Sequence, residues 1–175
     1  LYILGLLYVM ESFWFFISRF LRHSRLCYFF KIKLEYCSLI FFPTSMSTTL
    51  WLNPKYSDSD IKHLTKNLKK GNTYVDIGAN IGHLALAASK RIGQNGIILT
   101  VEGNERIAKF LKKNIKLNKR NIIVLSCIVG DKIGVAGIEN RKADDMNQVI
   151  ADGNKKMLTL DKICSNLDRI HLLKI

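Results

Sequence analysis

The segment Thr73–His83 constrains the fold more than any other part of the chain. A short apolar run ends near Asp76, and Gly78 and Gly82 then frame a tight turn before a helical pattern begins. Two glycines at this spacing suit a loop whose backbone approaches a ligand closely. A second acidic residue, Glu102, ends the next apolar run. The sequence therefore predicts a ligand site where two neighbouring strands end.

Strand and helix patterns alternate through the middle of the chain. We expect strands at 73–77, 97–101, 122–125 and 171–175, and helices at 81–91 and 104–117. Such alternation predicts right-handed crossovers and a parallel sheet. A helix from about 57 to 69 is expected only to pack against the sheet, and the polar segment 140–156 is expected to be a surface loop.

Residues 1–45 differ from the rest of the chain. Their apolar runs are interrupted by Glu11 and followed by Arg19, Arg22 and Arg25, and none reaches the roughly 18–20 residues of a membrane-spanning helix. Three interpretations stay open: a packed accessory segment, a helix in a membrane interface, and a segment that is not natively part of the protein. We therefore divide the chain into residues 1–45 and a domain over 46–175. We expect a cytoplasmic protein, with membrane association through residues 1–45 as an alternative.

Composition narrows the class of partner. The net charge of +13 favours acidic partners. Many basic residues fall within 104–120, where they are typical of the solvated face of an amphipathic helix and lack interleaved aromatic residues. The four cysteines have no paired spacing, so we expect reduced thiols and no metal site.

The chemistry of the turn favours one cofactor class. In a parallel sheet, ligands bind at the carboxyl ends of strands where the strand order reverses. There Asp76 can receive an ammonium group, free N–H groups of the turn can receive an anion, and Glu102 can accept ribose hydroxyls. The turn Gly78–Gly82 departs from the dinucleotide pattern GxGxxG, and Asp76 would repel a pyrophosphate. The residues favour S-adenosylmethionine, with a nicotinamide-dependent oxidoreductase as the alternative.

Several motifs resemble, in order, those of the FkbM family of S-adenosylmethionine-dependent methyltransferases. The resemblance covers about residues 55–175 and is carried by residues 75–82, 101–104, 111–118, 129–131, 159–161 and 172–175. It implies a class I fold: α/β, a Rossmann-like three-layer sandwich with a mostly parallel sheet, here truncated after strand four. It also implies O-methylation of a hydroxyl on a sugar, glycolipid or secondary metabolite, and no nucleic-acid partner.

The resemblance assigns roles to individual residues. Asp76, Gly78 and Gly82 would hold the methionine end of the cofactor, Asn80 would shape the turn, and Glu102 would hold the ribose. Gly103 replaces the family's usual proline, and an expected acidic patch would lie after Ile175. An inactive, truncated gene product is therefore a further alternative. The sequence identifies no catalytic residue, although His83 follows the turn closely, and it gives no oligomeric state.

Overall fold

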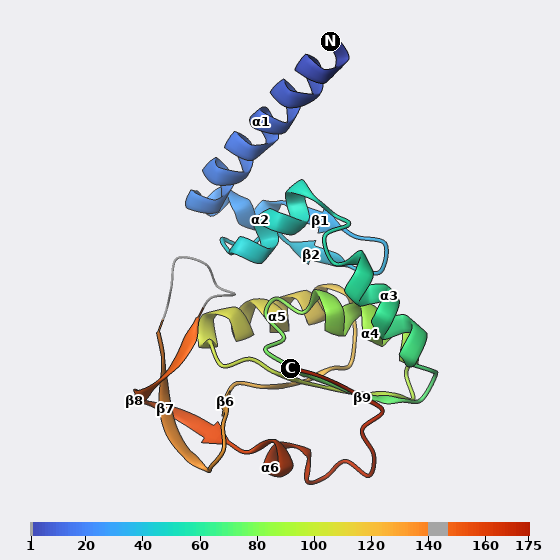
Figure 1. Cartoon of the computed structure of the whole chain (residues 1–175), viewed down its shortest axis with the longest axis vertical. Helices are drawn as coiled ribbons and strands as arrows, with labels where there is room; N and C mark the ends of the chain where they lie inside the picture. The colour runs from blue at the N-terminus through green and yellow to red at the C-terminus, as the bar shows by residue number, and fades with distance from the viewer. Residues whose placement is uncertain (1, 140–146) are drawn as a thin grey trace.

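A four-stranded parallel sheet forms the centre of the molecule. The computed structural model describes the backbone of residues 2–139 and 147–175, and the side chains of these residues from Phe13 onward except Arg25. The strands are β3 (Thr73–Ile77), β4 (Ile97–Val101), β5 (Ile123–Leu125) and β9 (Leu172–Lys174), in the order β5-β4-β3-β9 (Figure 1). All three pairings are parallel. The predicted α/β class is confirmed.

Helices cover both faces of this sheet, which gives three layers. Helices α4 (His83–Ile92) and α5 (Glu105–Leu117) pack on the face that carries Tyr74, whereas the short α6 (Leu160–Cys164) covers the face that carries Val75. Alternate residues of a strand point to opposite faces, so β3 can be buried on both sides. Helix α5 begins where Asn104 accepts hydrogen bonds from the N–H groups of Arg106 and Ile107.

A second, smaller sheet follows β5 in the chain. It contains β6 (Ile128–Val129), β7 (Gly134–Glu139) and β8 (Gln148–Leu158), in the order β6-β8-β7. The predicted surface loop over 140–156 is therefore wrong for residues 148–156, which pair with β7. Most residues of β8 are exposed, including the apolar Val149 and Ile150. The acidic pair Asp144-Asp145 lies outside the described residues.

The N-terminal region contains more secondary structure than its sequence suggests. Helix α1 (Tyr2–His23) is followed by η1 (Arg25–Phe29), the hairpin β1 (Lys31–Lys33) and β2 (Ser38–Ile40), α2 (Ser45–Leu52) and α3 (Asp58–Asn67). Among the residues whose side chains are described, no helix is both long enough and apolar enough to cross a bilayer. Figure 1 shows α1 projecting away from the body of the molecule.

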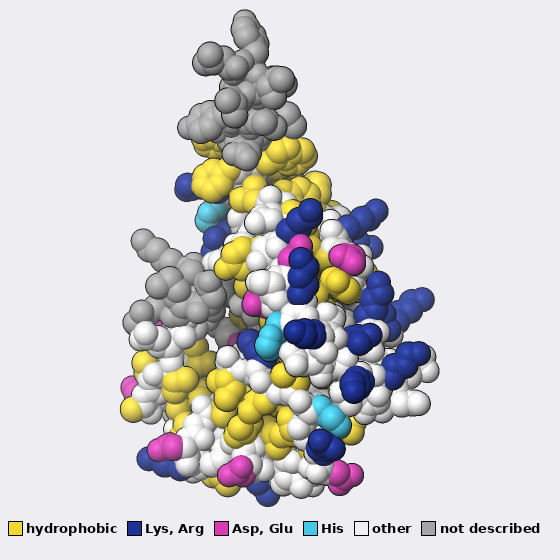
Figure 2. Space-filling view, turned by 45° about the vertical axis from the view of Figure 1, so that its right-hand side comes forward, with side chains coloured by type: hydrophobic (Ala, Val, Ile, Leu, Met, Phe, Trp, Pro, Cys, Tyr) yellow, Lys and Arg dark blue, Asp and Glu magenta, His cyan; other side chains and the backbone are white. Residues whose placement is uncertain are grey.

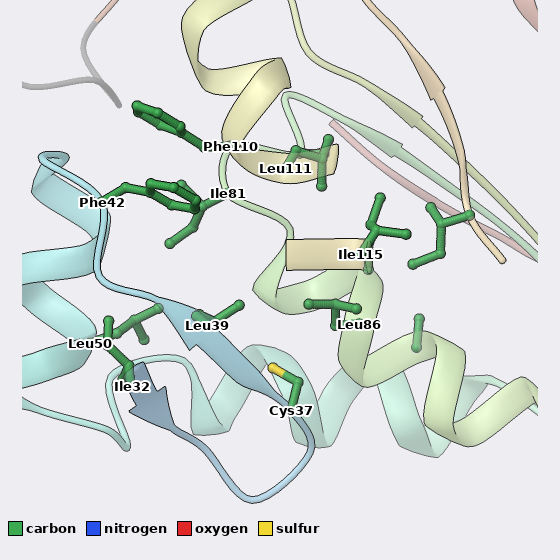
Figure 3. Close-up of a cluster of buried hydrophobic side chains, with 14 of the residues drawn as sticks. Ile32, Cys37, Leu39, Phe42, Leu50, Ile81, Leu86, Phe110, Leu111 and Ile115 are labelled. Carbon is green, nitrogen blue, oxygen red and sulfur yellow. The ribbon is translucent and has the colours of Figure 1, made fainter. Parts of the chain in front are cut away.

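The hairpin and the residues just after it join the core formed by the main sheet and its helices. Phe42 stacks on Phe110 of α5 with ring centroids 4.1 Å apart, and Leu39 lies in the same buried cluster (Figure 3). Asn114 of α5 and Asn118, which caps the end of that helix, accept hydrogen bonds from the backbone N–H groups of Ile40 and Ser38, at 2.9 and 3.0 Å. The hydrophobic core therefore runs across the proposed division at residue 45.

Candidate functional site

The strand order of the main sheet reverses at β3. β4 lies on one side of β3 and β9 on the other, which is where α/β sheets bind ligands. A cavity of about 570 Å³ lies beside the carboxyl end of β3. Its lining comes from segments far apart in the chain, and includes Ser57, Asp60, Asp76, Gly78, Asn80, His83, Glu102, Asn104, Val129 and Lys174. Asp76, Gly78, Asn80 and Glu102 of the predicted site are thus brought together.

The turn after β3 is fixed to the end of β4. Gly78 and Asn80 have φ angles of +70° and +51°. The N–H groups of Gly78 and Ala79 donate to the carbonyl of Val101 at 2.9 and 3.1 Å, and the N–H of Asn80 donates to Glu102. We expected free N–H groups in this turn, but these are already bonded within the protein. The backbone donors that remain for an anionic ligand group are the N–H groups in the first turn of α4, because these have no acceptors within the helix.

Glu102 connects the turn to the start of α5. Its Oε2 accepts from the N–H of Asn80 at 2.9 Å, and its Oε1 accepts from the N–H of Asn104 at 2.8 Å. Burial raises the pKa of this carboxyl group, and the two backbone hydrogen bonds oppose that effect. Each carboxylate oxygen has a further lone pair. The side chain is therefore held in place with acceptor capacity left for a ligand's hydroxyl groups.

Lys174 of β9 is a residue that the sequence analysis missed. Its ammonium lies 3.2 Å from Asp76 Oδ1 and donates to the carbonyls of Ile77 and Gly78, both at 3.0 Å. Asp76 is 1% exposed, and burial raises the pKa of its carboxyl group while Lys174 lowers it. Asp76 therefore already has a cationic partner within the chain, which weakens the argument that its charge requires a cationic cofactor. The sequence does contain a signal for this role, because Lys174 is the one basic residue in the apolar run 172–175.

His83 faces the same cavity from the start of α4. Its Nε2 lies 3.0 Å from the hydroxyl of buried Ser57, and its buried Nδ1 has no hydrogen-bond partner among the described residues. Burial lowers the pKa of the imidazole to about 4, so it is neutral at pH 7. His171 plays a structural role, because its Nδ1 accepts from the N–H of Thr73 at 3.0 Å. The predicted packing helix α3 thus also contributes to the site, through Ser57 just before it.

Gly82 serves the site through its conformation. It has a φ of +89°, and an added Cβ atom would overlap the side chain of Leu111 on α5. It is not among the residues that line the cavity. Gly82 therefore allows α4 to begin directly against α5, which places the turn and His83.

Two further grooves continue from the cavity toward α5 and the second sheet. One, of about 570 Å³, shares Asn104 and Ile138 with the first cavity and includes Arg106 and Lys155. The other, of about 290 Å³, adds Lys109 and is also lined by Lys155. Basic side chains from α5 and β8, together with the acidic Glu105 and Asp152, therefore border a path that leads away from the cavity.

Comparison with known proteins identifies the class of this site. Residues 52–167 match the family model described as the TRM5/TYW2 methyltransferase domain. This match agrees with the predicted class I S-adenosylmethionine-dependent methyltransferase, but it does not support the FkbM family. Nothing in the comparisons supports the nicotinamide-dependent alternative.

Individual relatives are similar over part of their length. Protein-L-isoaspartate O-methyltransferase of Methanosarcina mazei is 41% identical over 59 residues, which is 33% of this chain and 24% of that protein. The structure of M. jannaschii TYW2 in complex with AdoMet is 22% identical, with a TM-score of 0.43 over 55% of this chain and 42% of that one. Aeropyrum pernix fibrillarin, with natively bound S-adenosyl-L-methionine, is 23% identical, with a TM-score of 0.34 over 39% of this chain and 31% of that one.

Proposed function

The chain belongs to the TRM5/TYW2 methyltransferase domain family, and we propose that it transfers a methyl group from S-adenosylmethionine to a nucleic-acid acceptor. The observation that carries this proposal is the placement of Glu102 and the glycine turn beside one cavity at the reversal of strand order. The bound cofactor would supply an electrophilic methyl group. The residues of the chain would position it, because in-line transfer depends chiefly on alignment of donor and acceptor.

The cavity suits this cofactor in size and in polar groups. Its volume of about 570 Å³ falls within the roughly 300–1,000 Å³ of small-molecule sites. Asp76 is buried beside the turn and is paired with Lys174, whereas the buried Nδ1 of His83, in the same cavity, has no hydrogen-bond partner among the described residues. The ribose hydroxyls would be held by Glu102, and the methionine end would be held beside Asp76 and Lys174 by the first turn of α4. Burial raises the pKa of Asp76 and the Lys174 ammonium opposes that shift, so Lys174 favours the charged form of the carboxylate.

The lysine and arginine side chains at these grooves, together with the charge of the whole chain, support a polyanionic acceptor. The family points to tRNA or protein as the methylated molecule. Arg106, Lys109 and Lys155 border the grooves that leave the cavity, and the whole chain carries a net charge of +13. Phosphate groups bind such lysine and arginine clusters through charge-assisted contacts. We therefore replace the expected sugar or glycolipid acceptor, and the expected absence of a nucleic-acid partner, with RNA.

The cofactor site is tested by titration calorimetry with S-adenosylhomocysteine. Glu102→Gln replaces a carboxylate oxygen with an NH₂ group that faces a backbone N–H, so we expect affinity to fall about 10- to 100-fold. Glu35→Gln makes the same chemical change at an exposed position away from the cavity and should leave affinity unchanged. Equal affinities of both variants would remove Glu102 from the site. Binding of NAD in place of S-adenosylhomocysteine would refute the methyltransferase proposal.

The acceptor is tested by transfer of a radiolabelled methyl group from S-adenosylmethionine. Total tRNA, a protein extract and a glycolipid extract are offered separately to the same preparation. We expect label in tRNA, and we expect transfer to weaken steeply as salt is raised, because phosphate contacts are salt-dependent. Label in the protein or glycolipid fraction alone would overturn the nucleic-acid acceptor while retaining the cofactor assignment.

A further inference from the structure

Large apolar side chains are exposed around the C-terminal half of α1. We call Phe13, Trp14, Phe15, Phe16 and Phe20 the α1 aromatic cluster. Phe16 is 70% exposed and Phe20 is 65% exposed, and all five members fall in the exposed class. Figure 2 shows hydrophobic side chains gathered below the grey tip of the molecule, at the level of this helix. Exposed apolar groups this close together mark an interaction surface.

The helix is anchored to the body of the protein at one end. Leu21 lies in the main hydrophobic core, and the guanidinium of Arg22 donates to the hydroxyl of Ser45 at 3.4 Å. Trp14 also meets Trp51 of α2 edge to face, with ring centroids 6.3 Å apart. The cluster therefore sits on a fixed helix that projects from the protein, and the protein's own core does not cover it (Figure 1).

A cationic side chain, Arg19, lies directly beside the aromatic ones. A groove of about 330 Å³ is lined by Phe16 and Phe20 together with Arg19, His23 and Ser24. The sequence between Glu11 and Glu35 contains arginines and lysines but no acidic residue. An aromatic surface bordered by cations matches the interface of an anionic bilayer, where rings enter the headgroup region and cations meet lipid phosphates.

We propose that α1 docks this protein on an anionic lipid surface through the α1 aromatic cluster and Arg19. A second copy of the chain is a poorer occupant, because parallel pairing of two such helices would bring Arg19 and Arg22 close to their own counterparts, and no acidic residue lies between Glu11 and Glu35 to neutralise them. A bilayer supplies both the apolar depth and the negative charge. This surface lies outside the cofactor site, and docking does not depend on methyl transfer.

Vesicle co-sedimentation of the intact chain tests the proposal. The probes are vesicles of phosphatidylcholine alone and of phosphatidylcholine mixed with phosphatidylglycerol. We expect binding only to the anionic vesicles. Phe16→Ser combined with Phe20→Ser should weaken it about tenfold or more, and Arg19→Gln should weaken it severalfold. Ile133→Ser is the matched control, since Ile133 is 63% exposed and far from α1, and it should bind normally.

Tryptophan emission gives a second measurement. The chain has two tryptophans, so the Trp14→Phe variant leaves only Trp51. We expect a blue shift on adding anionic vesicles to the unmodified protein and no shift in Trp14→Phe. Three results would overturn the bilayer as the occupant. The first is equal binding to neutral vesicles, and the second is complete displacement by inorganic phosphate. The third is self-association without lipid that is lost in the variant with both Phe16→Ser and Phe20→Ser.

Discussion

His83 is neutral because the fold removes it from water. Its imidazole is almost fully buried and contacts Ser57, and the nearby Lys174 ammonium adds to the cost of a second positive charge. In the unfolded chain the same imidazole binds a proton with an ordinary pKa near 6.5. The difference between the two states makes the stability of the protein depend on pH.

We predict that stability falls as the pH is lowered from about 6.5 to about 4. The lowered pKa of about 4 means that the unfolded state binds more protons in this range, which costs about 3 kcal/mol in total. His83→Gln keeps a polar group toward Ser57 but does not titrate. The variant should therefore lose the part of the pH dependence of stability that His83 causes. The raised pKa values of Asp76 and Glu102 act in the opposite sense and remain in both proteins. Urea unfolding at several pH values measures the difference, and parallel pH profiles would contradict the prediction.

The turn between β3 and α4 shows how one element fixes its neighbour. Gly82 adopts a left-handed conformation and lies against Leu111 of α5, so the turn and the two helices fit together only with no side chain at this position. The same turn is bonded to the end of β4 through Val101 and Glu102. The geometry of the cofactor cavity therefore depends on the packing of α5.

We predict that Gly82→Ala destabilises the protein by about 3 kcal/mol or more, because conformational strain and overlap with Leu111 add together. Gly71→Ala is the matched control. Gly71 has a φ of +79° but nothing within 4 Å of an added Cβ, so only the backbone cost of about 1–2 kcal/mol applies. Denaturant unfolding of both variants measures the difference. Equal losses would show that Leu111 moves aside freely.

The core of the whole molecule includes the N-terminal hairpin. Phe42 and Leu39 lie in one buried cluster with Ile81 and Leu111, and Figure 3 shows these side chains gathered between the hairpin and the helices. The division at residue 45 rests on a change of composition, which reports what each segment contains and not what it packs against. From the packing, we propose that the folding unit includes the hairpin.

We predict that a chain beginning at Met46 loses cooperative unfolding. This deletion removes Phe42 and uncovers Phe110. As a point test, Phe42→Ala should cost about 3–5 kcal/mol, because its side chain is fully buried. Phe29→Ala, at a residue 83% exposed, is the control and should cost little. A stable chain beginning at Met46 would restore the boundary first expected from the sequence.

Local patterns were sufficient for the central elements. The runs 73–77 and 97–101 were predicted as strands with their observed bounds, because an apolar run that stops at glycine or an acidic residue is recognisable without its partners. Asp76 and Glu102 could be placed together for the same reason, since parallel strands end at one edge. Residues 148–156 of β8 were predicted as a loop because their side chains are mostly exposed and the strand is stabilised by pairing with β7.

The amino-acid sequence alone therefore identified the parallel sheet, the glycine turn and the cofactor class, all of which follow from residues close together in the chain. Folding brought Lys174 onto Asp76, and Ser57 onto His83, and placed the hairpin on α5. These contacts join positions far apart in the sequence, so no local pattern specifies them. The charge and the protonation of the site depend on such contacts, because burial and the neighbouring charged groups set the pKa of each side chain.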